Sequence, residues 1–195
     1  MGAYLRVAGT GLLADGSRLV WSVADGRLGR RWRAVASVDG AVTHGLLLEV
    51  DPDGRPSRLE LTTAAGMLTL HPDGEGRVLH GNVVTADGVR HVRLPWSDAH
   101  GLEVDRRPIA SAVTAHRLAS LLAVGEGRDV PVLVITADLA IKPATRRFDR
   151  VAEGDWRIAS PSGEDAVTLR IDGHGVPAAL HDTRAWPLEL DEAMD

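Results

Sequence analysis

The chain of 195 residues contains no cysteine. That absence excludes a disulfide scaffold, a cysteine-ligated zinc site and a thiol nucleophile. No apolar run approaches the roughly 18 residues that a membrane-spanning helix needs, and the first residues carry neither the basic nor the apolar segment of a secretion signal. We therefore expect a cytoplasmic protein with no integral membrane segment.

Lysine and aromatic residues are also scarce. Lys142 is the one lysine among 22 basic residues, and aromatic residues make up 4% of the chain. A formal net charge of −5 argues against nucleic acid as a partner. The composition, 44% apolar and 25% charged, is that of a globular protein. Because no linker or charge run divides it, we expect a single domain over residues 1–195.

The dipeptide Asp-Gly, in contrast, is frequent. Aspartate tolerates a positive φ and glycine favours it, so the pair suits the two-residue turns that connect antiparallel strands. The first six copies are 10 to 20 residues apart, which is the spacing of an antiparallel meander. The seven copies begin at Asp15, Asp25, Asp39, Asp53, Asp73, Asp87 and Asp172.

The segments between these turns have the patterns of strands. Residues 31–38 alternate, which places Trp32, Ala34, Ala36 and Val38 on one face. Residues 167–171 alternate in the same way. Residues 130–135 are almost continuously apolar, as in a strand covered on both faces, which requires Pro131 to lie at its beginning or on an edge.

One stretch has the pattern of a helix instead. Residues 108–122 lack glycine, begin with proline and end shortly before Gly125, which predicts a helix of about 12 to 15 residues. Its apolar stripe consists of Ile109, Val113, Leu118, Leu121 and Leu122. Many strands, one helix and further strands make an α+β fold that is mainly antiparallel β.

Motifs for catalysis, metal binding or a cofactor are missing. No two of the eight histidines lie three to five residues apart, and the chain has neither a Gly-x-Ser-x-Gly elbow nor a glycine-rich phosphate loop. We assign no catalytic residue, no metal and no cofactor. The densest group of polar residues consists of His80, His91, Asp98, His100 and Glu103. A hydrolase or isomerase that uses His91, Asp98 and His100 stays open as an alternative.

Tryptophan supplies five of the seven aromatic residues. Such side chains either fill the core or form the wall of a ligand cavity, where their ring faces stack on the ligand. For a cavity we expect Trp21, Trp32 and Trp96 in the wall, with His91 and Arg117 as polar anchors at the mouth. Trp186 belongs to a C-terminal tail, residues 181–195.

Several segments of the chain resemble the bacterial family of glycolipid-binding proteins. The similarity lies in the Val-Gly-Glu turn at 124–126, the strands at 130–134 and 142–150, and the segments 156–158 and 169–176. Upstream, 8–16 and 29–35 are similar to the first strands of that family. The resemblance extends over about residues 8–180.

The resemblance implies a spiral β-roll, a long curved antiparallel meander sheet wrapped over one main helix. It further implies a non-catalytic binding protein that holds an amphipathic or lipid-like ligand in a cavity of the curved sheet. In the segment 110–118, only Arg117 and Leu118 match the family, and Val78 stands where the family tends to have an aromatic residue. These departures imply a different ligand or none. A homodimeric interaction module that pairs through a sheet edge is another alternative.

Overall fold

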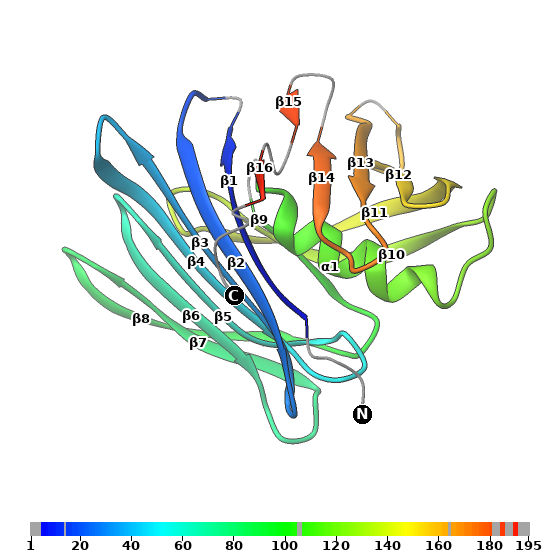
Figure 1. Cartoon of the computed structure of the whole chain (residues 1–195). Coiled ribbons are helices and arrows are strands. Elements are labelled where there is room, and N and C mark those ends of the chain that lie inside the picture. Colours follow the sequence, from blue (N-terminus) through cyan, green and yellow to red (C-terminus); the bar gives the residue numbers. More distant parts are fainter. Residues whose placement is uncertain are drawn as a thin grey trace.

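The computed structural model describes residues 5–13, 15–104, 107–163 and 165–180, together with two short strands, 184–185 and 189–190. It consists of two sheets with one helix between them (Figure 1). The expected tail at 181–195, including Trp186, otherwise lies outside the described residues.

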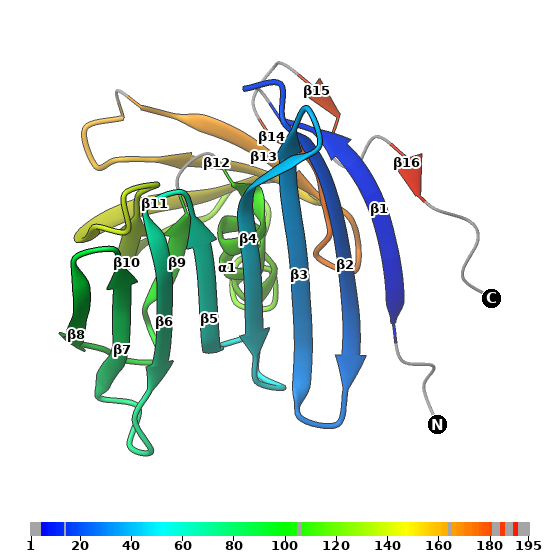
Figure 2. The same cartoon turned by 90° about the vertical axis from the view of Figure 1, so that its left-hand side faces the viewer.

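The first sheet is a nine-stranded antiparallel meander in which the order β16-β1-β2-β3-β4-β5-β6-β7-β8 follows the chain except for β16 (Figure 2). The strands curl around the helix, as the resemblance to the glycolipid-binding family implied. They are β1 (Arg6–Leu12), β2 (Arg18–Gly26), β3 (Gly29–Val38), β4 (Ala41–Val50), β5 (Pro56–Thr63), β6 (Gly66–Pro72), β7 (Val78–Thr85), β8 (Gly88–Pro95) and β16 (Glu189–Leu190).

The Asp-Gly pairs lie at the hairpin connections, as predicted from their spacing. Between β3 and β4, Asp39 and Gly40 both have positive φ, at 50° and 81°, which is the backbone of a two-residue turn that matches the strand twist. Because hairpins alternate between the two ends of a meander, the β2–β3 and β4–β5 turns share one end of the sheet. The β3–β4 turn lies at the other end.

The second sheet has seven strands in the order β15-β14-β13-β12-β11-β10-β9. Strand β9 pairs with β10 in parallel, and the helix forms the crossover between them. The strands are β9 (Gly101–Val104), β10 (Gly127–Ile135), β11 (Ile141–Ala152), β12 (Asp155–Ala159), β13 (Val167–Ile171), β14 (Pro177–Leu180) and β15 (Arg184–Ala185).

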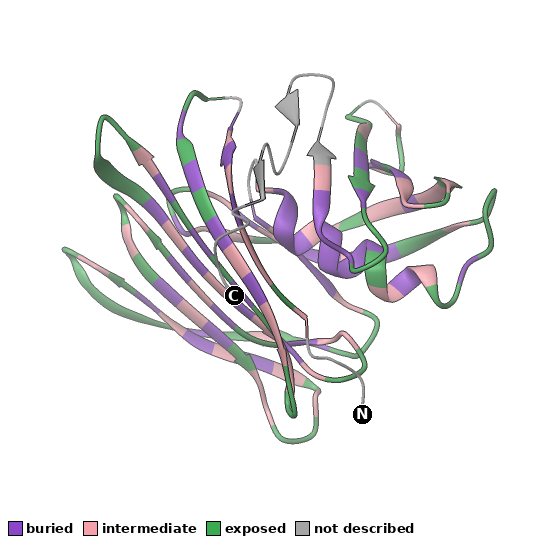
Figure 3. Ribbon diagram, viewed as in Figure 1, coloured by how far each residue is buried: buried purple, intermediate pink, exposed green. Residues whose placement is uncertain are grey.

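Helix α1 (Pro108–Ala119) lies inside the predicted segment 108–122 and packs against both sheets, so eight of its twelve residues are buried (Figure 3). Ile109 and Val113 join the core of the large sheet, whereas Ala112 and Ala115 join the core of the second sheet. Close packing requires glycine at 101, since a Cβ there would lie 2.7 Å from Oγ1 of Thr114. Among the described residues, no helix is both long and apolar enough to cross a bilayer.

Two details differ from the predicted faces. In β3, Trp32, Ala34 and Ala36 are buried as expected, but Val38 is 42% exposed because the pairing with β4 shifts register after Ala36. Leu121 is exposed because the helix ends at Ala119, before the predicted stripe is complete.

Pro131 lies on a local edge, as predicted. It is the fifth residue of β10 and pairs with Thr145 of β11, whereas the pairing with β9 on the other side begins only at Val132. On the side of β9, the missing N–H therefore costs no bond of the ladder.

Candidate functional site

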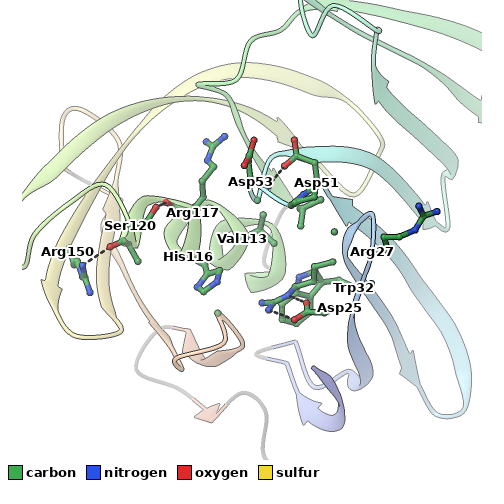
Figure 4. Close-up of a pocket in the computed structure, with 18 of the residues that line it drawn as sticks. Asp25, Arg27, Trp32, Asp51, Asp53, Val113, His116, Arg117, Ser120 and Arg150 are labelled. Carbon is green, nitrogen blue, oxygen red and sulfur yellow. Dashed lines mark hydrogen bonds and ion pairs between the residues drawn. The ribbon is translucent and has the colours of Figure 1, made fainter. Parts of the chain in front are cut away.

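A cavity of about 680 Å³ lies between the two sheets, at the end that carries the β2–β3 and β4–β5 turns (Figure 4). The C-terminal half of α1 forms one wall. The other walls come from those two turns, from the β11–β12 turn and from the β13–β14 turn. No single segment builds this cavity, which exists because both sheets meet the same helix.

The floor of the cavity is apolar. It includes Trp32, Val50 and Val113, each of which is buried. Trp32 is 1% exposed and packs against Trp21 with 6.3 Å between ring centroids. The indole Nε1 of Trp32 is buried and has no hydrogen-bond partner among the described residues.

Arg30, which forms an ion pair on the β2–β3 hairpin, links the two sheets across the cavity. The guanidinium of Arg30 binds both carboxylate oxygens of Asp25, at 2.6 and 3.2 Å, in a bidentate arrangement. It also donates a hydrogen bond to the backbone carbonyl of His174, in the β13–β14 turn of the second sheet. Arg30 therefore fixes the distance between two walls of the cavity.

Arg150 stabilises the wall formed by the helix. From β11 it donates hydrogen bonds to the carbonyls of Ala119 and Leu122, at 2.9 and 2.7 Å, and it pairs with Glu153. The last carbonyls of a helix lack partners within the helix, and a cation satisfies both their hydrogen bonds and the helix dipole. Arg150 thus holds the end of α1 at the cavity.

Arg117, in the last turn of α1, separates this cavity from an adjoining one of about 510 Å³ that it also lines. Its guanidinium donates to the carbonyls of Asp98 and His100, at 2.7 and 3.1 Å. Partial burial and the nearby positive charge of Arg55 lower the pKa of Arg117. These hydrogen bonds go to backbone carbonyls, and Arg117 makes no ion pair with a described carboxylate.

His116 faces the cavity from the same turn of α1 (Figure 4). Partial burial, followed by the charge of Arg30, lowers the pKa of His116, which favours the neutral imidazole. The ring packs directly on Gly175, where a Cβ would lie 2.6 Å from Cγ of His116.

We expect the substitution Gly175→Ala to shift His116 and to narrow the cavity. The backbone at this position has a φ of +76°, so alanine adds strain to the steric conflict. Backbone strain of this kind alone costs about 1–2 kcal/mol of unfolding free energy, and the conflict with His116 should make the loss at Gly175 larger than that. Urea denaturation measures the loss. Gly16→Ala is the matched control, since φ is also positive there but a Cβ would meet nothing within 4 Å. Equal losses in the two variants would contradict a steric contribution from His116.

The residues predicted for the site occupy different places. Trp32 and Arg117 line the cavity, and Trp21 lies behind Trp32 in the core. His91 lies exposed on β8, with its Nδ1 2.6 Å from Oδ1 of Asn82, and Trp96 is buried and stacks on His100. Neither His91 nor Trp96 lines this cavity.

Members of the polar group around His91 bond to residues outside that group. Asp98 pairs with Arg55, Glu103 with Arg146, and His100 bonds to Ser97. Within the described parts of the chain, no group of three or more histidine or acidic residues has the arrangement of a metal site. Residues that line the cavity but were not singled out from the sequence include Arg30, His116 and Arg150.

Comparisons with known proteins identify a fold. A crystal structure of a DUF1089 family protein from Pseudomonas aeruginosa matches with a TM-score of 0.53 and 18% sequence identity, over 92% of this chain and 89% of that one. No family model and no curated protein matches the sequence. The two proteins therefore share the same general fold, and the likeness assigns no ligand.

Proposed function

We propose that this protein is a non-catalytic binding protein that holds an amphipathic, lipid-like small molecule in the cavity beside the end of α1. The observation that carries the proposal is the combination of an apolar floor with a charged rim in one cavity of about 680 Å³. Known small-molecule sites have volumes of about 300–1,000 Å³ and combine apolar walls with a few polar groups.

The two parts of the cavity suit the two parts of such a ligand. Trp32, Val50 and Val113 offer apolar surface for a hydrocarbon portion. Arg30 with Asp25, and Arg117 above the helix end, offer donors and acceptors for a polar head group. The resemblance to glycolipid-binding proteins supports a head group of this kind.

Native mass spectrometry of the freshly purified protein, with solvent extraction of bound molecules, tests the proposal directly. We expect a reproducible additional mass that extracts as a lipid. The proposal would be contradicted if the purified protein carried no additional mass, and still carried none after exposure to a lipid mixture.

A cavity-filling variant locates the ligand. Ser120 is exposed, ends α1 and lines the cavity, so Ser120→Trp fills its mouth without disturbing the core. With N-phenyl-1-naphthylamine as a fluorescent probe, we expect binding to weaken at least about tenfold, or about 1.4 kcal/mol. Ser162→Trp, at an exposed serine in the β12–β13 turn, is the control and should bind as the wild type does. Unchanged binding by Ser120→Trp would remove the cavity as the site.

A further inference from the structure

The tip of the β2–β3 hairpin presents an apolar side chain to solvent beside the cavity. Leu28 is 79% exposed, which is the highest value among the large apolar side chains described. Its neighbours Arg27 and Gly29 both line the cavity. Hydrophobic side chains that are exposed singly are common, but this one projects from a hairpin tip at the mouth of a cavity.

Other exposed apolar side chains belong to segments at the same cavities. Leu121 lines the adjoining cavity and is more than half exposed. Val151 follows Arg150 directly in sequence, and Val124 lies in the connection that leaves the helix end. Several segments that line the cavities therefore carry an exposed aliphatic side chain.

Arg27 adds a positive charge beside Leu28. Its side chain is exposed and makes no ion pair or hydrogen bond with another described residue. A guanidinium binds phosphate oxygens with two parallel hydrogen bonds. An apolar side chain with an unpaired arginine next to it is suited to the interface of a phospholipid bilayer, where acyl chains lie below phosphate groups.

We propose that the β2–β3 hairpin docks on a phospholipid bilayer, with Leu28 inserted among the acyl chains and Arg27 on the lipid phosphates. This docking brings the mouth of the cavity to the lipid surface. The inference rests on the proposed function, because a lipid-like ligand has to enter the cavity from a membrane. One inserted leucine gives weak and reversible attachment, as collection or delivery of a ligand requires.

Sedimentation with vesicles tests the docking. The probes are large unilamellar vesicles of phosphatidylcholine, with and without one quarter of phosphatidylglycerol. We expect the wild type to pellet with both, and Leu28→Ser to lower its partition coefficient about tenfold, the effect of losing one buried leucine. Arg27→Ser should lower binding mainly to the vesicles that contain phosphatidylglycerol. Leu28→Trp should bind at least as well as the wild type and show a blue-shifted emission.

Val42→Ser is the matched control. Val42 is 68% exposed, but it follows the β3–β4 turn at the opposite end of the sheet. If Val42→Ser reduces sedimentation as much as Leu28→Ser does, or if the wild type stays in solution, the docking proposal is overturned.

The binding of N-phenyl-1-naphthylamine separates this inference from the proposed function. Leu28 does not line the cavity, so Leu28→Ser should bind the dye as the wild type does. Vesicle binding that depends on Leu28 without any dye or lipid in the cavity would leave the docking intact and refute the ligand. A filled cavity without vesicle binding would support the ligand and overturn the docking.

Discussion

Replacing Trp32 with alanine is expected to lower the free energy of unfolding by about 3–5 kcal/mol. The side chain is 1% exposed and belongs to the core of the large sheet, where it packs against Trp21. Its removal leaves a void that the curled sheet cannot close. Urea denaturation followed by circular dichroism measures the loss.

A second variant, Trp32→Phe, tests whether the indole nitrogen contributes to stability. The indole Nε1 of Trp32 has no partner among the described residues, so phenylalanine removes no hydrogen bond to another described residue and keeps most of the ring. We expect a loss of only about 1–2 kcal/mol. Trp32→Phe, which should stay folded, is then the variant for dye binding. A loss as large as that of alanine would contradict this account of the indole nitrogen.

The same residue illustrates how much of the site the sequence predicts. Alternation in residues 31–38 placed Trp32 on the inner face of a strand, and the structure confirms this. The sequence left open whether tryptophans fill the core or line a cavity. Trp32 does both, because the floor of the cavity is the edge of the core. One-dimensional patterns identify a face, but they do not show what lies opposite it.

The fold could be predicted from the sequence more fully than the site, and the reason is physical. Asp-Gly turns and strand alternation are local signals, and a meander pairs neighbouring strands, so local signals determine most of its topology. The polar wall depends on contacts between distant segments. Arg30 meets His174 across 144 positions in the chain, and Arg150 caps a helix that ended 31 positions earlier. No spacing in the sequence predicts these contacts, because they follow from the curl of one sheet against the other.

The protein is expected to lose stability as the pH falls from about 6.5 to 4, and His44 is the principal histidine responsible. His44, on β4, is 6% exposed and faces a small cavity of about 220 Å³ at the end opposite the candidate site. Burial, followed by the positive charge of Arg107, lowers the pKa of His44 from its usual 6.5 to about 4, and Asp15 opposes the shift only in part. The neutral imidazole is therefore the folded form.

The sign of the effect follows from proton binding in the two states. Between pH 6.5 and 4 the unfolded chain binds a proton at His44 that the folded chain excludes, so acid favours unfolding. The full interval corresponds to about 3 kcal/mol, all of which is retained above pH 6.5 and lost near pH 4. This loss is comparable to the removal of a large core side chain.

His44→Gln isolates this contribution from the carboxylates that titrate in the same range. Glutamine is polar, fits the small cavity and carries no charge at any of these pH values. We expect the free energy of unfolding, measured by urea denaturation at pH 7 and pH 4, to change by about 3 kcal/mol less in the variant than in the wild type. The carboxylates contribute equally to both proteins and cancel in the difference. Parallel pH profiles would mean that His44 accepts a proton within the folded protein, which would require a partner for its buried Nε2, a nitrogen that has none among the described residues.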